Sequence, residues 1–477
     1  MKEERFSKLG FILSGLGMAI GTGNIWRFPR VITQNGGGAF IIPWLIFLFI
    51  WCLPLLAIEI AIGRNFRKGV LSSFKEGMGE RYTWLGAFVA WVSTAILFYY
   101  SVVVGWCIKY ILATIFNYKE LSNSQSFWLS FTSGYQPLLF NALSLLIGGL
   151  VIIAGVSSGI EKVNKILIPS LFIILIGGVI RSFTLPGAIK GFDFLFSPNF
   201  SLLKDYNVWL NALSQAAWST GAGWGLILTY AVYMSKREDT IFTASTITFG
   251  DYSASILAGM TVVPTLFYVL GLNEKALSDI LKKSNQGLTF ISIPSLFQKL
   301  PMGQIALLIF FVALFFAAFT SLLSLIELPT RILIDAGLSR RKAVIFVLIV
   351  SFIAGIPSAI SMKFFNNQDW TWGVALIVSG FFFSLFVIKF GTEKFRKELI
   401  EKTSKIKLGR FFDIVVKYLI PFQFTVLLIW WFYQSVKWEK WSRVFGEYSL
   451  LSVVLQWLIF GFIFFLFNKI LSEKVAK

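Results

Sequence analysis

Histidine is missing from this sequence of 477 residues, and cysteine occurs only twice, as Cys52 and Cys107. Without histidine the chain cannot use the commonest general base, the zinc-binding helices of metalloproteases or a histidine-ligated haem. Both cysteines lie within apolar stretches, so we expect neither a disulfide framework nor a thiolate metal site. These absences exclude most metal chemistry and much of acid–base catalysis.

Charged residues are also scarce, at 14% of the chain, whereas hydrophobic residues make up 56% and aromatic residues 17%. Soluble domains are about 45–50% apolar, and many runs here exceed the roughly 18 apolar residues that indicate a membrane span. The sequence therefore predicts an all-α polytopic protein embedded in a lipid bilayer. No short hydrophobic segment with a small-residue cleavage site opens the chain, so we expect residues 1–8 to form a cytoplasmic tail.

The apolar runs predict twelve spans. They cover residues 8–34, 38–63, 84–114, 138–156, 164–184, 207–234, 248–271, 302–335, 342–362, 370–391, 414–435 and 448–469. An even number places both termini on one side of the membrane. Basic residues gather in the loops on that side, which the positive-inside rule assigns to the cytoplasm.

The net charge of +19 follows from this bias. The most basic loop joins the tenth and eleventh spans and carries Lys394, Arg396, Lys397, Lys402, Lys405, Lys407 and Arg410. Because retained cytoplasmic loops explain the charge, we expect no nucleic-acid partner. Tryptophans at the span ends, Trp430, Trp431, Trp438 and Trp441, indicate an interfacial belt or a dimer face, so both a monomer and a homodimer remain open.

Two spans contain helix breakers. The first has glycines at 15, 17, 21 and 23 together with Asn24 and Arg27, and the sixth has Gly221, Gly223 and Gly225. Glycine destabilises a helix interior, and irregular backbone at membrane depth persists only where it lines a cavity or is buried in protein. Small residues also serve close helix packing. Breaks at matching places in two sets of five spans favour instead an inverted-repeat transporter with a site near the midplane.

The motifs around these breaks resemble the neurotransmitter:sodium symporter family, in particular its bacterial amino-acid transporters. The resemblance covers nearly the whole chain and rests on residues 23–29, 35–40, 58–64, 158–162 with Pro169, 229–233 and 316–321. It implies two inverted repeats of five spans, residues 1–184 and 207–391. The remaining region, residues 392–477, would hold the basic cytoplasmic loop and two further spans.

The resemblance implies two sodium sites. The first would use Ala19, Asn24, Ser219 and Asp251 together with the substrate carboxylate. The second would use backbone oxygens of Gly17, Ile20 and Ala317 and the hydroxyls of Thr320 and Ser321. Sodium prefers oxygen ligands, and a broken helix frees the carbonyls to supply them. A hydroxyl at these positions could instead bond the preceding helical turn.

The implied substrate site lies between the two breaks. Its predicted residues are Met18, Ala19, Thr22, Gly23, Ile96, Tyr100, Trp218, Ser219, Gly221, Trp224, Ser321 and Leu325. Thr22 and Gly23 amides and the Tyr100 hydroxyl would bind a carboxylate at the positive end of a half-helix. Relatives that carry monoamines have an aspartate where this chain has Gly21, so a substrate with its own carboxylate is favoured. The uncharged wall favours a neutral aliphatic or aromatic amino acid.

Further residues are implied to gate and brace this site. Arg27 and Asp369 would close the outer side, although Asp369 could be an ordinary interfacial acid. Arg5 and Asp335, with Tyr233 nearby, would latch the cytoplasmic side. Glu59, an acid inside the second span, would brace the broken sixth helix.

Chloride dependence is not expected. Gln215, Ser219 and Ser255 match the chloride-site positions of relatives, but Trp44 replaces the tyrosine expected there and Asp251 already supplies a negative charge.

We therefore predict a sodium-coupled symporter, not an enzyme, that imports a neutral, hydrophobic amino acid by alternating access across the plasma (inner) membrane of a prokaryote. A non-transporting receptor or scaffold of the same fold is the alternative. An intramembrane hydrolase would need a catalytic pair or metal cluster within the spans.

Overall fold

The computed structural model describes residues 5–270, 284 and 286–475, and over these residues the chain is helical, with no strand. Residue 271, where the seventh predicted span ends, and the extreme ends of the first and third predicted regions lie outside the described residues. Within that described part, nine helical stretches are long and apolar enough to cross a membrane: Gly38–Phe66, Glu80–Phe116, Gln136–Ile153, Val156–Phe183, Thr240–Val269, Gly303–Asp335, Arg340–Ile360, Met362–Phe390 and Gly409–Trp438. Two further stretches qualify as bent pairs, Lys8–Ala19 with Gly23–Gln34 (51°) and Leu450–Leu466 with Asn468–Lys474 (62°).

The first half of the chain supplies these elements. They are α1 (Lys8–Ala19), η1 (Gly23–Arg27), α2 (Phe28–Gln34), α3 (Gly38–Phe47), η2 (Leu48–Cys52), α4 (Leu53–Phe66), α5 (Val70–Met78), η3 (Glu80–Tyr82), α6 (Thr83–Phe116), η4 (Tyr118–Asn123), α7 (Ser124–Thr132), α8 (Gln136–Ile153), η5 (Val156–Glu161), α9 (Lys162–Phe183) and α10 (Ala188–Phe196). The sixth predicted span is the pair α11 (Tyr206–Ser219) and α12 (Leu226–Ala231), preceded by η6 (Phe200–Lys204).

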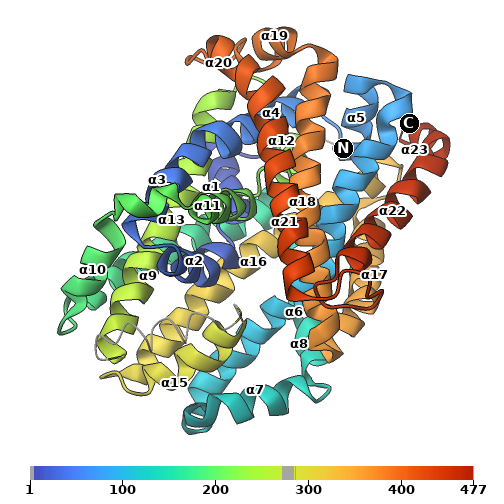
Figure 1. Ribbon diagram of the computed structural model, residues 1–477. Coiled ribbons are helices and arrows are strands. Elements are labelled where there is room, and N and C mark those ends of the chain that lie inside the picture. The colour runs from blue at the N-terminus through green and yellow to red at the C-terminus, as the bar shows by residue number, and fades with distance from the viewer. Residues whose placement is uncertain (1–4, 271–283, 285, 476–477) are drawn as a thin grey trace.

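The second half continues in the same way. Its elements are α13 (Thr240–Val269), η7 (Gly287–Ser292), α15 (Ile293–Phe297), α16 (Gly303–Asp335), α17 (Arg340–Ile360), α18 (Met362–Phe390), α19 (Thr392–Phe395), η8 (Arg396–Ile400), α20 (Gly409–Ile414), η9 (Val415–Leu419), α21 (Ile420–Trp438), α22 (Leu450–Leu466) and α23 (Asn468–Lys474). In Figure 1 the N and C labels lie toward the end that holds α5 and α23, whereas α7 and α15 lie at the opposite end.

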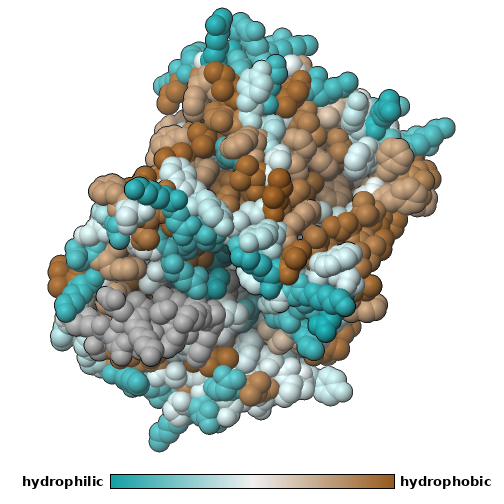
Figure 2. All heavy atoms as spheres, viewed as in Figure 1, coloured by the Kyte–Doolittle hydropathy of each residue, from teal (hydrophilic) through white to brown (hydrophobic). Residues whose placement is uncertain are grey.

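The long helices pack around α1 and α6. Helix α6 contacts α8, α16 and α18, and α1 contacts α9, α13 and α16. Apolar side chains of α21 and α22, such as Phe422, Leu458 and Phe462, remain exposed. In Figure 2 hydrophobic surface over these helices separates hydrophilic ends of the molecule. A lipid-facing belt accounts for this exposure, because a soluble protein rarely leaves so large an apolar area uncovered.

One predicted feature of the belt differs in the structure. Trp431 is buried and packs on Trp370 with ring centroids 4.4 Å apart, and Trp438 lies 4.9 Å from the same ring. Both tryptophans line the central cavity described below. Both therefore form part of its wall. Trp431 is buried there, so the interfacial interpretation is wrong for that residue, whereas Trp438 remains exposed at the end of α21.

Candidate functional site

The first break lies between α1 and η1. Helix α1 ends because Ile20 takes an extended conformation (φ −77°, ψ 99°), and the chain resumes as a wide helical turn from Gly23. The second break separates α11 from α12, where Gly221, Gly223 and Gly225 have φ values of +65°, +86° and +79°. Only glycine adopts such values without strain, so this triplet ends the helix. Both breaks leave backbone groups without helical partners at mid-span.

Glu59 of α4 holds the second break, as the sequence analysis predicted for this residue. Its Oε1 accepts a hydrogen bond of 2.5 Å from the Gly223 amide, and the carboxyl group is fully buried. Space is tight on the other side, because a Cβ on Gly223 would stand 2.5 Å from the Gly380 backbone. The loop between α11 and α12 is therefore fixed from both sides.

A cavity of about 620 Å³ lies between the two breaks. All twelve residues predicted for the substrate site line it: Met18, Ala19, Thr22, Gly23, Ile96, Tyr100, Trp218, Ser219, Gly221, Trp224, Ser321 and Leu325. At its polar end the Thr22 amide donates to the Tyr100 hydroxyl over 3.3 Å. At its apolar end Gly221 makes room for Met18, since a Cβ there would stand 2.6 Å from the methionine sulfur.

The first oxygen cluster joins α13 to both breaks. The Asn24 Nδ2 lies within hydrogen-bonding distance of Asp251 Oδ1 (2.7 Å), Ser219 Oγ (2.9 Å) and Ser255 Oγ (2.8 Å), and Ser219 Oγ donates to Asp251 Oδ2 (3.1 Å). Asp251 is fully buried, and among the described residues no lysine or arginine lies within 4.0 Å of its carboxylate. A buried carboxylate without a cationic side chain is costly, so this donor set fits a bound monovalent cation.

The second oxygen cluster centres on Ser321 of α16. Its Oγ lies 3.3 Å from the Gly17 carbonyl oxygen, 3.4 Å from those of Met18 and Ile20, and 3.2 Å from that of Ala317. One hydroxyl proton can satisfy only one of four carbonyls. Thr320 Oγ1 adds a hydroxyl, which bonds the carbonyls of Phe316 and Ala317 over 2.9 and 3.1 Å. Converging oxygens with too few protons also fit a hard cation.

The predicted outer gate residues lie on the cavity wall but apart from each other. Arg27 Nη2 donates to Ser214 Oγ over 3.0 Å, and its guanidinium lies 5.3 Å from the Trp218 ring centre. Asp369 lines the same cavity from α18. Within the described part of the chain these two groups form no ion pair, so in this structure the cavity extends past them to Tyr448.

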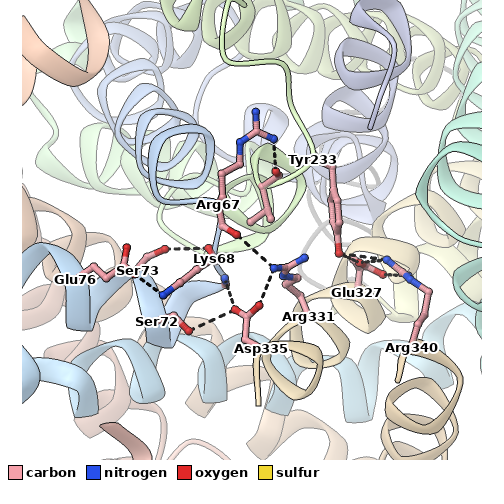
Figure 3. A network of polar contacts seen from close by, with 12 residues as sticks. Arg67, Lys68, Ser72, Ser73, Glu76, Tyr233, Glu327, Arg331, Asp335 and Arg340 are labelled. Carbon is pink, nitrogen blue, oxygen red and sulfur yellow. Dashed lines mark hydrogen bonds and ion pairs between the residues drawn. The ribbon is translucent and has the colours of Figure 1, made fainter. Parts of the chain in front are cut away.

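The end of the molecule near the N-terminus is closed by a polar network (Figure 3). Asp335, predicted to pair with Arg5, instead forms an ion pair of 2.7 Å with Arg331 and accepts from the Gly69 amide over 2.6 Å. The Phe6 amide donates to the Tyr233 carbonyl, so the chain next to Arg5 does reach the expected place. The part played by Arg5 itself remains a prediction.

Figure 3 also shows a buried acid, Glu327, that is absent from the residues predicted from the sequence. Glu327 of α16 is fully buried, accepts a bidentate bond from Arg340 (2.8 Å to each oxygen) and accepts from the Tyr233 hydroxyl (2.8 Å). An acid inside an apolar span is a signal of function, and this rule applies to Glu327 as it does to Glu59 and Asp251, whose roles the family resemblance also implies. Its partner could not be found this way, because Arg340 belongs to the next helix.

The family model described as "Sodium:neurotransmitter symporter family" matches residues 2–130 and 136–467. An uncharacterized sodium-dependent transporter of Methanocaldococcus jannaschii is 33% identical over 448 residues, which cover 90% of each chain. The uncharacterized sodium-dependent transporter YhdH of Bacillus subtilis is 31% identical over 408 residues, covering 80% of this chain and 86% of the relative. The sodium-dependent serotonin transporter of Drosophila melanogaster is 26% identical over 482 residues, which cover 90% of this chain and 76% of the relative.

Among solved structures, the crystal structure of MhsT in complex with L-phenylalanine matches with a TM-score of 0.79 at 30% identity. It covers 90% of this chain and 99% of MhsT. These matches confirm the predicted family, the helical membrane fold and the expectation of a transporter in place of an enzyme. The chain belongs to the sodium:neurotransmitter symporter family and is a multi-pass, sodium-dependent symporter.

Proposed function

We propose that this symporter couples sodium entry to the import of a neutral amino acid with an apolar side chain, by alternating access. The observation that carries the proposal is the composition of one cavity. It joins the Thr22–Gly23 backbone at the first break, an oxygen cluster with the buried carboxylate of Asp251, and an uncharged wall of apolar side chains. An amino acid presents the matching carboxylate, ammonium and side chain.

The substrate backbone would bind at the two breaks. Its carboxylate would meet the Thr22 and Gly23 amides and the Tyr100 hydroxyl, which already lies 3.3 Å from the Thr22 nitrogen. Carbonyl oxygens near Ala19 and Trp218 would hold the ammonium. Gly21 has no carboxylate that could pair with an amine. The ammonium group of a substrate without its own carboxylate would therefore find no negative partner at this position.

Two sodium ions are proposed. The first would bind Ala19, Asn24, Ser219, Asp251 and the substrate carboxylate, with Asn24 contributing its Oδ1, which in this structure accepts from the Gly21 amide over 2.8 Å. The second would bind Gly17, Ile20, Ala317, Thr320 and Ser321. Because the substrate carboxylate is itself a ligand of the first ion, the ion and the substrate would each raise the affinity of the other by the same factor. Asp251 supplies the negative charge, so chloride would not be required.

The apolar wall sets the side-chain preference. Met18, Ile96, Trp224 and Leu325 line the cavity, and Trp218 lies beside Trp224 with ring centroids 6.2 Å apart. Such a wall favours an aliphatic or aromatic side chain. The L-phenylalanine bound in the MhsT structure supports the same class.

The remaining expectations are proposed with this function. Residues 1–184 and 207–391 would form the repeats, with both termini in the cytoplasm of a prokaryotic cell. Arg27 and Asp369 would approach each other when the outer side closes, whereas Arg5, Tyr233 and Asp335 would separate when the inner side opens. The protein would work as a monomer or a homodimer.

A non-transporting receptor of the same fold would bind the same ligand, and both oxygen clusters argue against it. A receptor without coupled transport has no need of two cation sites, whereas a symporter uses them to drive uptake. Binding alone cannot separate the two, so the transport measurement that ends the Discussion does so.

Thermal stability of the purified protein tests the binding site. We expect apolar amino acids, with L-phenylalanine as the first probe, to raise the unfolding midpoint in sodium chloride and equally in sodium gluconate, but not in potassium chloride. A ligand at 100 times its dissociation constant adds about 2.7 kcal/mol, or about 3 °C or more. Arginine and glutamate serve as charged controls. A shift that persists in potassium would contradict the sodium site, and one lost in gluconate would contradict chloride independence.

A further inference from the structure

Asn164 of α9 is a buried polar residue outside every site assigned above. Its side chain is fully buried, and its Nδ2 donates to the Ile160 carbonyl over 2.9 Å and lies 3.5 Å from Ser14 Oγ. Its Oδ1 has no hydrogen-bond donor among the residues that the structure describes. A buried amide oxygen without a partner is costly, so its persistence calls for an explanation.

The direction of the amide is fixed by its surroundings. Turning it over would place Oδ1 at 2.9 Å from the Ile160 carbonyl oxygen, and two acceptors cannot bond each other. The oxygen therefore points away from its own helix, toward α1.

There it meets the second oxygen cluster. A Cβ on Gly17 would stand 2.3 Å from Asn164 Oδ1 and 3.0 Å from Thr320 Cβ, so the amide oxygen and the threonine flank the same backbone unit. The Gly17 carbonyl is one of the four that surround Ser321. Glycine at 17 is what lets Asn164 come so close, because any side chain there would occupy the position of its oxygen.

The cluster contains no carboxylate among the groups named for it, since Gly17, Ile20, Ala317, Thr320 and Ser321 offer only carbonyls and hydroxyls. A cation held by neutral oxygens alone depends on their number and orientation. An unpartnered amide oxygen beside this cluster is suited to add one more.

We propose that Asn164 is a further ligand of the second sodium ion, contributing its Oδ1 from α9 on the side of the site where α9 approaches Gly17 of α1. The proposal rests on the proposed function, because it assumes that the cluster binds sodium. It gives the unpartnered oxygen a cationic partner, which the described side chains do not supply. It also makes α9 part of the cation site, so the ion would link α1, α9 and α16.

The test measures the sodium concentration at which L-phenylalanine stabilises the purified full-length protein. We expect Asn164→Ala to raise that concentration about tenfold, because the variant removes one oxygen from a cation site built of neutral ligands. Affinity for L-phenylalanine at saturating sodium should stay unchanged. Asn164→Asp keeps an oxygen and should need no more sodium than the wild type.

Two controls isolate the oxygen. Ser14→Ala removes the neighbour of Nδ2 but leaves Oδ1 in place, and Asn141→Ala removes another buried amide, in α8, whose two polar atoms also have no partner among the described residues. Both should keep the wild-type sodium requirement. An unchanged requirement in Asn164→Ala, while the wild type responds to sodium, would overturn the ligand role alone. A wild type that shows no sodium response would overturn the proposed function and this inference together.

Discussion

Asp251→Asn should raise the sodium requirement for substrate binding about 100-fold or more. The carboxylate is fully buried, and its hydrogen bonds come only from neutral groups, Asn24 and Ser219. Removing one partner of a buried charge pair costs about 3–5 kcal/mol, which corresponds to at least two powers of ten in affinity. Asparagine has the same shape, so the fold should persist. The measurement is a sodium titration of the stability gained with L-phenylalanine.

Asp205→Asn is the matched control for this substitution. Asp205 is exposed and caps α11 by accepting from the Asn207 amide over 2.9 Å, a role that asparagine fills equally well. It should behave as the wild type. If Asp251→Asn titrates with sodium like Asp205→Asn, then the Asp251 carboxylate is not a cation ligand.

Arg340→Ala should be strongly destabilising, although Arg340 lies at the end of a helix. Its guanidinium holds both oxygens of Glu327 at 2.8 Å, and Glu327 is fully buried. Without this partner the carboxylate would remain as a buried charge, at a cost of about 3 kcal/mol or more. We expect the unfolding midpoint to fall by several degrees, and the end near the N-terminus to open more readily, because Tyr233 shares the same carboxylate.

A double substitution identifies the cause. Glu327→Gln removes the charge, so Arg340→Ala combined with Glu327→Gln should recover most of the lost stability. Arg341→Ala, at the exposed neighbouring position, should change little. If the double variant is no more stable than Arg340→Ala, then the loss comes from packing, and the ion pair does not explain it.

Much of the fold follows from the sequence, because a membrane span needs a long apolar run and little else. The predicted span 302–335 differs from α16 (Gly303–Asp335) by one residue. The breaks follow as well, since Gly221 and Gly223 adopt positive φ values that other residues avoid. All twelve residues predicted for the substrate site line one cavity. These twelve residues follow from the family resemblance, because sequence spacing alone does not show that α6, α11 and α16 lie together.

What the sequence did not predict depends on which helices touch. Glu327 could have been noticed as an intramembrane acid, but its pairing with Arg340 requires the turn between α16 and α17. Asp335 pairs with Arg331, four residues before it on the same helix, a local partner that competes with the N-terminal arginine implied by the family resemblance. Asn164 gives no signal in the sequence, because its significance lies in the approach of α9 to Gly17.

The central claim is coupling, and uptake by reconstituted liposomes tests it most directly. Labelled L-phenylalanine would be offered to liposomes containing the protein, with an inward sodium gradient or with potassium on both sides. We predict accumulation above the outside concentration that requires the sodium gradient and collapses when the gradient is dissipated. Binding without accumulation would contradict this account and favour a receptor. Equal uptake in potassium would show that sodium does not drive transport.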